Sequence, residues 1–580
     1  MKELKHLNKY FFKYKYHFLI GIAITIIAQF FTLYTPKLIG DSIKILEHTN
    51  QSIEDKTSAI SLNIIWVIVT TLIAGFFTFL MRQTLIVMSR HIEYDLKNEV
   101  FYKYETLCQS FYKNNRIGDL MNRISEDVGK VRQYVGPAVM YTINTVIRFT
   151  VVLVQMYIIS PELTIYTILP LPLLSYFIYK VSKEINKRSS IFQANLSSLS
   201  TFTQETFSGI HLVKAYGLEK KKIEEVKNLS KQSKSKNLDL VKVNAMFGPL
   251  MVLLIGLSNL IVIYIGGKLY VEGSITDIGV IAQFILYINM LTWPIASLGW
   301  VSTMVQEAEA SQARINEFLK EEPTIKNEVD KITPIKGNIQ FANVSFTYPD
   351  TGITALKNIN FTINEGETIA IMGNTGSGKS TLLNLICRLY DTNSGEVYID
   401  HLQTNKHNLY NLRNNIAVVP QDAFLFSDSI ENNIRFGKED ATQQEIEEAT
   451  KIAHVHHNIE GFNNGYKTIL GERGISLSGG QKQRVSIARA IIKNAPILLL
   501  DDSLSAVDSE TEEKIISNIK NATKNITTLI VTHRVSAAIN ADKIIVLEDH
   551  TIKEMGHHND LIALNGYYKN LFDKQIHNKK

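Results

Sequence analysis

The chain has 580 residues, of which 45% are hydrophobic and 20% are charged, and its formal net charge is +5. This length exceeds what one hydrophobic core normally organises, so we expect two or more domains. The small basic excess suits a protein on an anionic membrane surface rather than one that binds nucleic acid. The two cysteines, Cys108 and Cys387, lack metal or redox spacing, so they imply no disulfide framework and are compatible with a reducing cytosol.

Six apolar segments occupy the first half of the chain, at about 17–35, 60–81, 136–158, 162–180, 248–270 and 278–305. Each is near or above the roughly 20 residues that a membrane-spanning helix needs. No small-residue cleavage site follows the first segment, so we do not interpret it as a signal peptide. The sequence therefore predicts a transmembrane domain of six helices over 1–318.

Lysine and arginine placement predicts the orientation of these helices, because basic residues collect on the cytosolic side. They precede the first segment and fill the two long connections, 82–135 and 181–247. The connection at Ser160–Glu162 has none, and the one near Glu272 has only Lys268. We therefore expect a multi-pass protein of the inner or plasma membrane with its N-terminus, long connections and C-terminal half in the cytosol.

The long connections are predicted to be helical extensions of the spans. No proline falls in 37–136 or 173–248, so nothing breaks a helix there. A polar linker follows at 319–336, with Pro323 and Pro334. Beyond it, 337–580 alternates strand-like and helical segments, which predicts an α/β domain.

The strongest motif lies between the strand-like run 368–372 and the helical run 382–389. This is the context that a phosphate-binding loop requires, and its glycines let backbone N–H groups surround the phosphates. We expect Lys379 to neutralise the β- and γ-phosphates and Ser380 to bind Mg²⁺. The predicted ATP-binding residues of the loop are Gly373, Asn374, Thr375, Gly376, Ser377, Gly378, Lys379, Ser380 and Thr381.

A buried strand, 497–500, ends in Asp501, which is predicted to hold the Mg²⁺ shell beside this loop. Between the two elements stand Leu477, Ser478, Gly479, Gly480 and Gln481. With this motif the chain resembles an ATP-binding cassette (ABC) protein, whose signature sequence these residues match closely.

The resemblance implies roles for further residues. Tyr348 would stack on adenine, and Gln421 would sense Mg²⁺ as the Q-loop glutamine. Residues 471–474 resemble the loop that precedes the signature in exporters, and 505–508 resemble the D-loop with its Asp508. His533 would be the switch histidine that contacts the γ-phosphate.

The resemblance also covers the membrane half. Residues 111–128 are similar to the first intracellular coupling region of ABC exporters, and 205–217 to the second. Six spans followed by one ATPase domain resemble a half-transporter. The resemblance implies a second half-transporter as partner, because each ATP would lie between one subunit's phosphate loop and the other's signature.

One residue departs from the family pattern. Members that hydrolyse ATP well carry Glu directly after the strand aspartate, whereas this chain has Asp502. The shorter side chain keeps its charge but reaches less far, and losing a positioned base costs about 10²–10⁴-fold. Asp502 is thus predicted to be a slow catalytic base, together with Gln421 and His533 in the catalytic set. This pattern resembles the degenerate subunit of heterodimeric bacterial exporters, and a homodimer with a weaker base is the alternative.

The predicted function is ATP-driven export of drugs or other lipophilic compounds. Lipid or peptide export and metal-chelate import stay open, although a start so close to the first span disfavours a bacteriocin-type exporter. A channel-like or regulatory ABC protein is the candidate from another class. Within the spans, Arg148 is the clearest polar residue, and we expect it to pair with another helix rather than contact substrate.

Overall fold

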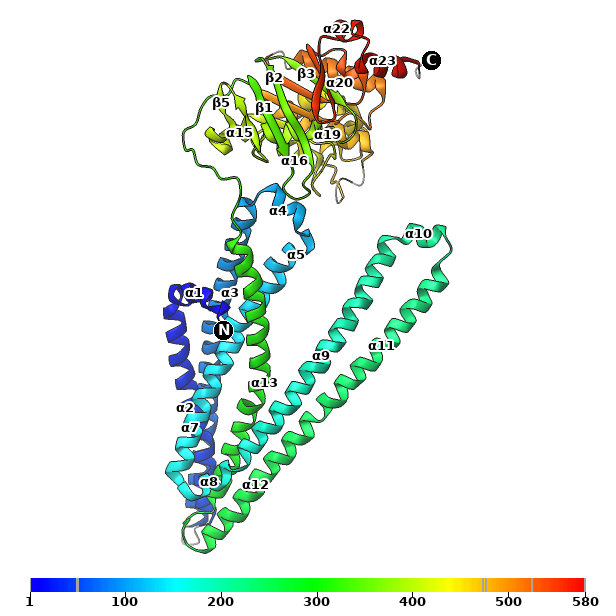
Figure 1. The fold of residues 1–580 in the computed structure, drawn as a ribbon. Coiled ribbons are helices and arrows are strands. Elements are labelled where there is room, and N and C mark those ends of the chain that lie inside the picture. Colours follow the sequence, from blue (N-terminus) through cyan, green and yellow to red (C-terminus); the bar gives the residue numbers. More distant parts are fainter. Residues whose placement is uncertain (1, 48–51, 472–473, 475–476, 523–524, 578–580) are drawn as a thin grey trace. The chain divides into compact units, whose positions relative to one another are not determined.

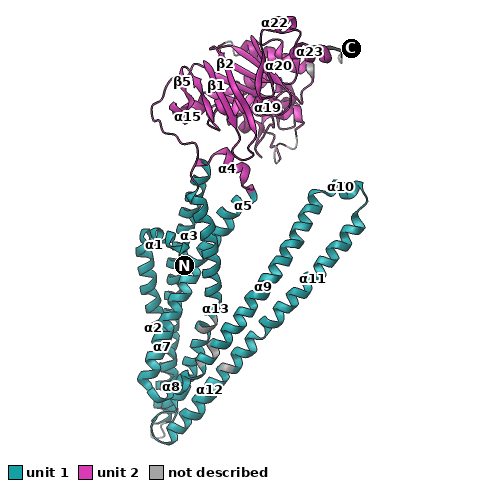
Figure 2. Ribbon diagram, viewed as in Figure 1, with its two compact units in different colours: residues 1–105, 118–321 teal, residues 106–117, 322–580 magenta. Residues whose placement is uncertain are grey.

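The computed structural model describes residues 2–47, 52–471, 474, 477–522 and 525–577 (Figure 1). The chain forms two compact units (Figure 2). The membrane unit comprises residues 1–105 and 118–321, and the nucleotide unit comprises 106–117 and 322–580.

The membrane unit is helical in its described part. Its elements are η1 (Glu3–Leu7), α1 (Asn8–Lys13), α2 (Lys15–Glu47), α3 (Ile53–Thr106), α5 (Ile117–Asn122), η2 (Arg123–Asp127), α6 (Val128–Gln133), η3 (Tyr134–Ala138), α7 (Val139–Ile159), α8 (Pro161–Ile168), α9 (Pro170–Ser208), α10 (Ile210–Ala215), α11 (Glu219–Ala245), α12 (Phe247–Val271) and α13 (Gly279–Lys320).

Five stretches of described helix are long and apolar enough to cross a membrane: Lys15–Glu47, Ile53–Thr106, Ile117–Ile159, Glu219–Val271 and Gly279–Lys320. They coincide with five of the six predicted segments. The remaining segment, 162–180, is also helical, but Leu169 separates it into α8 and α9. A sixth span there stays a prediction.

The helices extend far beyond a bilayer, as expected from the absence of proline. Helix α3 has 54 residues and α9 has 39, whereas about 20 residues span the hydrocarbon region. Helices α9 and α11 run side by side to α10 (Figure 1). The predicted helical extensions are therefore confirmed.

Small and polar residues join the helices of this unit. A Cβ on Gly279 of α13 would lie 2.2 Å from the carbonyl oxygen of Gly40 on α2, so the two backbones touch there. Arg148 Nε on α7 donates a hydrogen bond to Gln29 Oε1 on α2, at 2.8 Å. Gln29 Nε2 in turn donates to Asn144 Oδ1, at 2.5 Å. Arg148 thus pairs with a neighbouring helix, as the sequence predicts.

The nucleotide unit alternates strands and helices. Its strands are β1 (Ile339–Thr347), β2 (Thr354–Ile363), β3 (Thr368–Gly373), β4 (Ser394–Ile399), β5 (Leu402–Gln403), β6 (Ile416–Val419), β7 (Ile497–Asp501), β8 (Thr527–Val531), β9 (Lys543–Glu548) and β10 (Thr551–Gly556). Its helices are α4 (Gln109–Asn114), α14 (Lys379–Ile386), η4 (Thr404–Lys406), α15 (Leu409–Asn414), α16 (Ile430–Arg435), α17 (Gln443–Ile452), α18 (His456–Glu460), η5 (Gly465–Lys467), α19 (Gly479–Ile492), α20 (Ser509–Ala522), α21 (Val535–Ala538), α22 (His558–Ala563) and α23 (Tyr567–His577).

These strands form two sheets, in the orders β2-β1-β4-β5 and β10-β9-β3-β8-β7-β6. The first is antiparallel, while the second is parallel except for β10. Strand β7 reads Ile-Leu-Leu-Leu because a parallel strand is covered on both faces. This parallel sheet positions the candidate site.

Candidate nucleotide site

Four neighbouring parallel strands bring the predicted motifs to one edge of the sheet. The phosphate loop follows β3, His533 follows β8, Asp501 ends β7, and Gln421 follows β6. The carboxyl ends of parallel strands share one edge, where α/β proteins bind ligands. Residues that are more than 150 positions apart in the chain, Lys379 and His533, therefore meet because β3 and β8 are paired.

These residues surround a cavity of about 380 Å³. The predicted residues that line it are Tyr348, Thr375, Gly376, Gly378, Lys379, Ser380, Thr381, Gln421, Asp501, Asp502 and His533. The lining also includes Lys113 and Asp350, which the sequence did not single out for this site.

The phosphate loop has the backbone that its glycines permit. Gly376 and Gly378 have φ values of 82° and 101°, a region that other residues rarely adopt. Lys379 Nζ donates to the carbonyl oxygens of Gly373 and Asn374, at 3.0 and 2.8 Å. The buried hydroxyl of Ser377 has no hydrogen-bond partner among the described residues. An ammonium group and an unused hydroxyl are what an incoming phosphate needs.

Electrostatics at this loop also favour an anion. Burial lowers the pKa of Lys379, and the carboxylates of Asp502 and Asp501 oppose that shift. The helix α14 begins at Lys379 and directs its free N–H groups toward the loop. A polyphosphate would stabilise the lysine's charge at this position.

Ser380 and Asp501 form a hydroxyl–carboxylate pair, in which Ser380 Oγ donates to Asp501 Oδ1 at 2.9 Å. Burial raises the pKa of Asp501, while the Ser380 hydrogen bond lowers it. A bound cation would offset this desolvation. Among the described residues there is no cluster of three or more His, Cys, Asp or Glu side chains that could hold a metal. The oxygens of Ser380, Asp501 and Gln421 suit Mg²⁺, which takes few protein ligands and completes its shell with water and substrate phosphate.

Hydrogen bonds hold the backbone of Asp502 at both its N–H and its carbonyl group. Its φ is 43°, and its N–H donates to Val531 O at 2.9 Å. Its own carbonyl oxygen accepts from Ser505 Oγ at 2.9 Å. The carboxylate cannot therefore advance into the cavity by a backbone shift without breaking these bonds.

Tyr348 also lines the cavity. Its hydroxyl shares a hydrogen bond of 2.9 Å with Thr381 Oγ1, and its ring packs edge-on against Phe346 and Tyr390. The Nζ of Lys113, on α4, lies 4.5 Å from the ring centroid of Tyr348. The coupling-region resemblance of 111–128 was the only sequence signal for Lys113, and pattern reasoning missed its place here.

His533 lies between this cavity and the C-terminal helix. Burial lowers its pKa, Lys379 adds to that effect, and Asp502 opposes it. Gln575 Nε2 on α23 donates to the carbonyl oxygen of His533 at 2.8 Å. No motif marks Gln575, so this contact could not be predicted from local sequence.

The signature residues do not line this cavity. Ser478 caps helix α19: its Oγ accepts from Gln481 N at 3.3 Å, and Gln481 Oε1 accepts from Ser478 N at 3.0 Å. Leu477 is buried, whereas Ser478 and Gly479 are exposed. The signature is thus a preformed helix N-terminus with an open face. Parts of the preceding loop, residues 472–473 and 475–476, lie outside the described residues.

The D-loop is held by two buried or half-buried side chains. Gln483 Oε1 accepts from Ala506 N at 3.0 Å, and Arg534 donates to the carbonyl oxygens of Ser505 and Val507, each at 2.8 Å. Asp508 Oδ1 accepts from Thr511 N at 2.9 Å and so caps α20. The loop is therefore ordered although it lines no part of the cavity.

Two family models match the chain. Residues 18–295 match the ABC transporter transmembrane region, and residues 356–505 match ABC transporter. The chain belongs to the ABC transporter family. It is a multi-pass inner-membrane half-transporter of the bacterial exporter type that hydrolyses ATP to drive transport.

Relatives match over nearly the whole length. The multidrug resistance-like ATP-binding protein MdlA of Buchnera aphidicola subsp. Schizaphis graminum is 36% identical, over 99% of this chain and 98% of its own. MdlA of Escherichia coli is 34% identical, over 99% of this chain and 97% of its own. A probable multidrug resistance ABC transporter ATP-binding/permease protein of Bacillus subtilis, YheI, is 34% identical over 99% and 97%.

The fold is also found among solved structures. A bacterial Atm1-family ABC exporter with ATP bound has a TM-score of 0.81, with 96% of this chain and 99% of that chain covered. Its sequence identity is 23%, so this likeness concerns the fold alone. The predicted fold class, a helical membrane domain joined to an α/β ATPase, is confirmed.

Proposed function

We propose that this ABC transporter chain is one half of a heterodimeric exporter of lipophilic compounds. Its own ATP site hydrolyses slowly, and its signature motif, Leu477–Gln481, completes the partner's site. ATP binding closes the two nucleotide domains and turns the membrane cavity outward, and hydrolysis resets it. Ser380, Asp501 and Gln421 would hold Mg²⁺, which would neutralise charge at the phosphates when bound.

The observation that carries this proposal is the tethered backbone of Asp502. A general base must approach its proton within about 2.6–3.2 Å. Asp502 is one methylene shorter than Glu, and hydrogen bonds to Val531 and Ser505 hold its backbone. The backbone therefore cannot move to compensate for the shorter side chain. This favours slow hydrolysis at a site that retains its ATP-binding residues.

The open signature supports the second half of the proposal. Ser478 and Gly479 are exposed at the start of α19, where free N–H groups favour a phosphate. They do not line the cavity of their own chain. A phosphate on this helix would therefore come from the ATP of the partner subunit.

The substrate class rests on the relatives. Three with whole-length matches carry multidrug resistance in their names. An ATP-dependent lipid A-core flippase of Syntrophus aciditrophicus is 34% identical over 85% of this chain and 82% of its own. Lipid export is thus the second candidate, and both substrates are amphipathic or lipophilic.

The first test measures ATP hydrolysis by the purified chain alone and after co-expression with a half-transporter that carries Glu at the equivalent position. We expect low activity alone and a large increase with the partner, which Ser478→Arg in this chain should abolish. High activity of the chain alone, unchanged by the partner, would instead favour the homodimer.

ATP-dependent uptake of lipophilic dyes or labelled lipid into inverted vesicles separates the two substrate classes. An ATP-gated ion current in place of uptake would favour a channel.

The second test is Asp502→Glu. If reach is limiting, single-site hydrolysis should rise by at least about tenfold, because a positioned base contributes about 10²–10⁴-fold. Asp549→Glu is a matched control, because Asp549 also has a positive φ, 48°, and lies in the β9–β10 turn away from the cavity. An unchanged rate in Asp502→Glu would show that reach is not the limit.

A further inference from the structure

The C-terminal helix α23 contacts two loops of the ATP site. Gln575 binds both sides of the turn that carries His533: its Nε2 donates to His533 O at 2.8 Å, and its Oε1 accepts from Val535 N at 2.9 Å. A single amide side chain therefore replaces a pair of backbone hydrogen bonds across this turn, and the donor–acceptor pattern allows only one orientation of the amide.

The same helix also contacts the phosphate loop. Tyr567, at the first position of α23, donates from its hydroxyl to Asn374 Oδ1 at 2.6 Å. Tyr567 and Gln575 are separated by about 12 Å along the helix axis, at 1.5 Å per residue. They lie two turns apart, so one helix holds the two loops between which a triphosphate would lie.

Helix α23 is firmly anchored. The carboxylate of Glu554 on β10 accepts from the N–H groups of Tyr567 and Tyr568, at 2.5 and 3.0 Å. The Tyr568 side chain is fully buried beside Ala370 and Met372 of β3. Its hydroxyl shares a hydrogen bond of 2.7 Å with His558 Nδ1. The positions of Gln575 and Tyr567 are therefore set by the core of the sheet that also carries the phosphate loop.

We propose that α23 is a positioning element of the ATP site, in which Gln575 fixes the His533 turn and Tyr567 fixes Asn374. The proposal rests on the role of His533 at the γ-phosphate. Without Gln575, the carbonyl oxygen of His533 and the N–H of Val535 lose their partners, and the imidazole loses its fixed direction. The site should then distinguish ATP from ADP less well while it still binds both.

The test uses the full-length chain in detergent with Mg²⁺ and compares the affinities for a non-hydrolysable ATP analogue and for ADP. This readout needs no turnover and is therefore independent of Asp502. Gln575→Ala should lower the affinity ratio by about fivefold, because a misdirected imidazole would lose part of its charge-assisted hydrogen bond to the γ-phosphate. His533→Ala should lower it similarly, and the double variant should be no worse than His533→Ala alone. Lys574→Ala, at the adjacent exposed position, is the control and should change nothing.

Two further measurements separate positioning from a loss of folding. In Gln575→Ala, amide hydrogen exchange at Val535 should become faster by about tenfold while the thermal midpoint stays close to that of Lys574→Ala. Gln575→Glu keeps the acceptor for Val535 N–H but loses the donor to His533, so it should protect the amide and still lower the affinity ratio. Tyr567→Phe should weaken both nucleotides by about twofold without changing their ratio.

Several results would overturn the proposal. An unchanged ratio in Gln575→Ala beside a reduced ratio in His533→Ala would reject the positioning role alone. Additive losses in the double variant would show that Gln575 acts elsewhere. An unchanged ratio in His533→Ala would reject the γ-phosphate role of His533, and with it both this inference and that part of the proposed function.

Discussion

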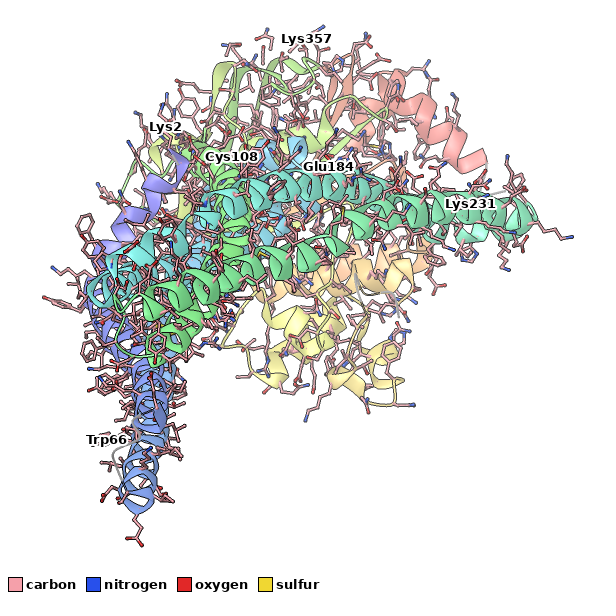
Figure 3. The ribbon with its side chains drawn as sticks, turned by 90° about the horizontal axis from the view of Figure 1, so that it is seen from below. Lys2, Trp66, Cys108, Glu184, Lys231 and Lys357 are labelled. Carbon is pink, nitrogen blue, oxygen red and sulfur yellow. The ribbon has the colours of Figure 1, made fainter. Side chains whose placement is uncertain are left out.

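The two units of this ABC transporter place apolar residues in opposite ways. On α3 of the membrane unit, Leu62 and Trp66 are 56% and 51% exposed, and Figure 3 shows Trp66 on that helix. On β7 of the nucleotide unit, Ile497 and Leu499 are 0% exposed. Inside the membrane unit, the helices instead contact one another through Gly40 and Gly279 and through the hydrogen bonds of Arg148 and its amide partners. Lipid is as apolar as a leucine side chain, so close backbone contact and polar pairing hold membrane helices together.

The sharpest way to break this comparison is to truncate one leucine in each unit. Leu499→Ala should destabilise the nucleotide unit by about 2–5 kcal/mol, because it leaves a cavity in a packed core. Leu62→Ala should change stability by less than about 0.5 kcal/mol, because its side chain faces outward. All three tryptophans, Trp66, Trp293 and Trp300, lie in the membrane unit. Thermal unfolding followed by tryptophan fluorescence therefore reports that unit, and loss of nucleotide binding on heating reports the other.

A second test addresses the helix contact in the membrane unit. Gly279→Ala should lower the tryptophan-detected midpoint, because the new Cβ would lie 2.2 Å from Gly40 O. We expect a cost of about 1–3 kcal/mol, as for other overpacked positions. Gly267→Ala on α12 is the matched control, since nothing described lies within 4 Å of its Cβ position. Equal midpoints for the two variants would contradict the close contact, and nucleotide affinity should be unchanged in both.

The smallest effect concerns the pH dependence of the nucleotide unit. The pKa of His533 is lowered in the folded state, mainly by burial. Between that pKa and the unfolded value of about 6.5, the unfolded chain binds more protons, so stability falls as pH decreases through this range. His533→Gln should therefore show a shallower loss of stability between pH 7 and 5.5. The measurement is the thermal midpoint of ADP binding across that range, because ADP lacks the γ-phosphate that His533 is proposed to contact. An equal slope in both proteins would contradict the prediction.

Local sequence was enough to predict the backbone of those parts of the candidate ATP site that are continuous in the chain. The phosphate loop needs glycines at fixed positions and a lysine at the start of a helix, and the structure has Gly376, Gly378 and Lys379 in those places. Strand β7 was evident because an apolar run ending in Asp501 has few other interpretations. Ser478 at the start of α19 was equally local, because capping needs only residues three apart.

The lengths of the helices could also be predicted from the sequence, but the positions where helices are interrupted could not. The absence of proline predicted the long α3, α9 and α11. Segment 162–180, predicted as a single span, is divided at Leu169, directly before Pro170. A proline can begin a helix or bend one, and only the packing of α8 and α9 decides between these outcomes.

The sequence by itself determined the family, the order of the motifs and the aspartate at position 502. Each depends on residue types within a few positions, where covalent geometry limits the possible arrangements. The tertiary structure decided which loops meet, because strand order in a sheet depends on contacts between distant segments. It placed Lys113 over Tyr348, tied the Asp502 backbone to β8 through Val531, and directed Gln575 to the His533 turn. No local pattern encodes these contacts, since each joins elements whose separation along the chain carries no information about their distance in space.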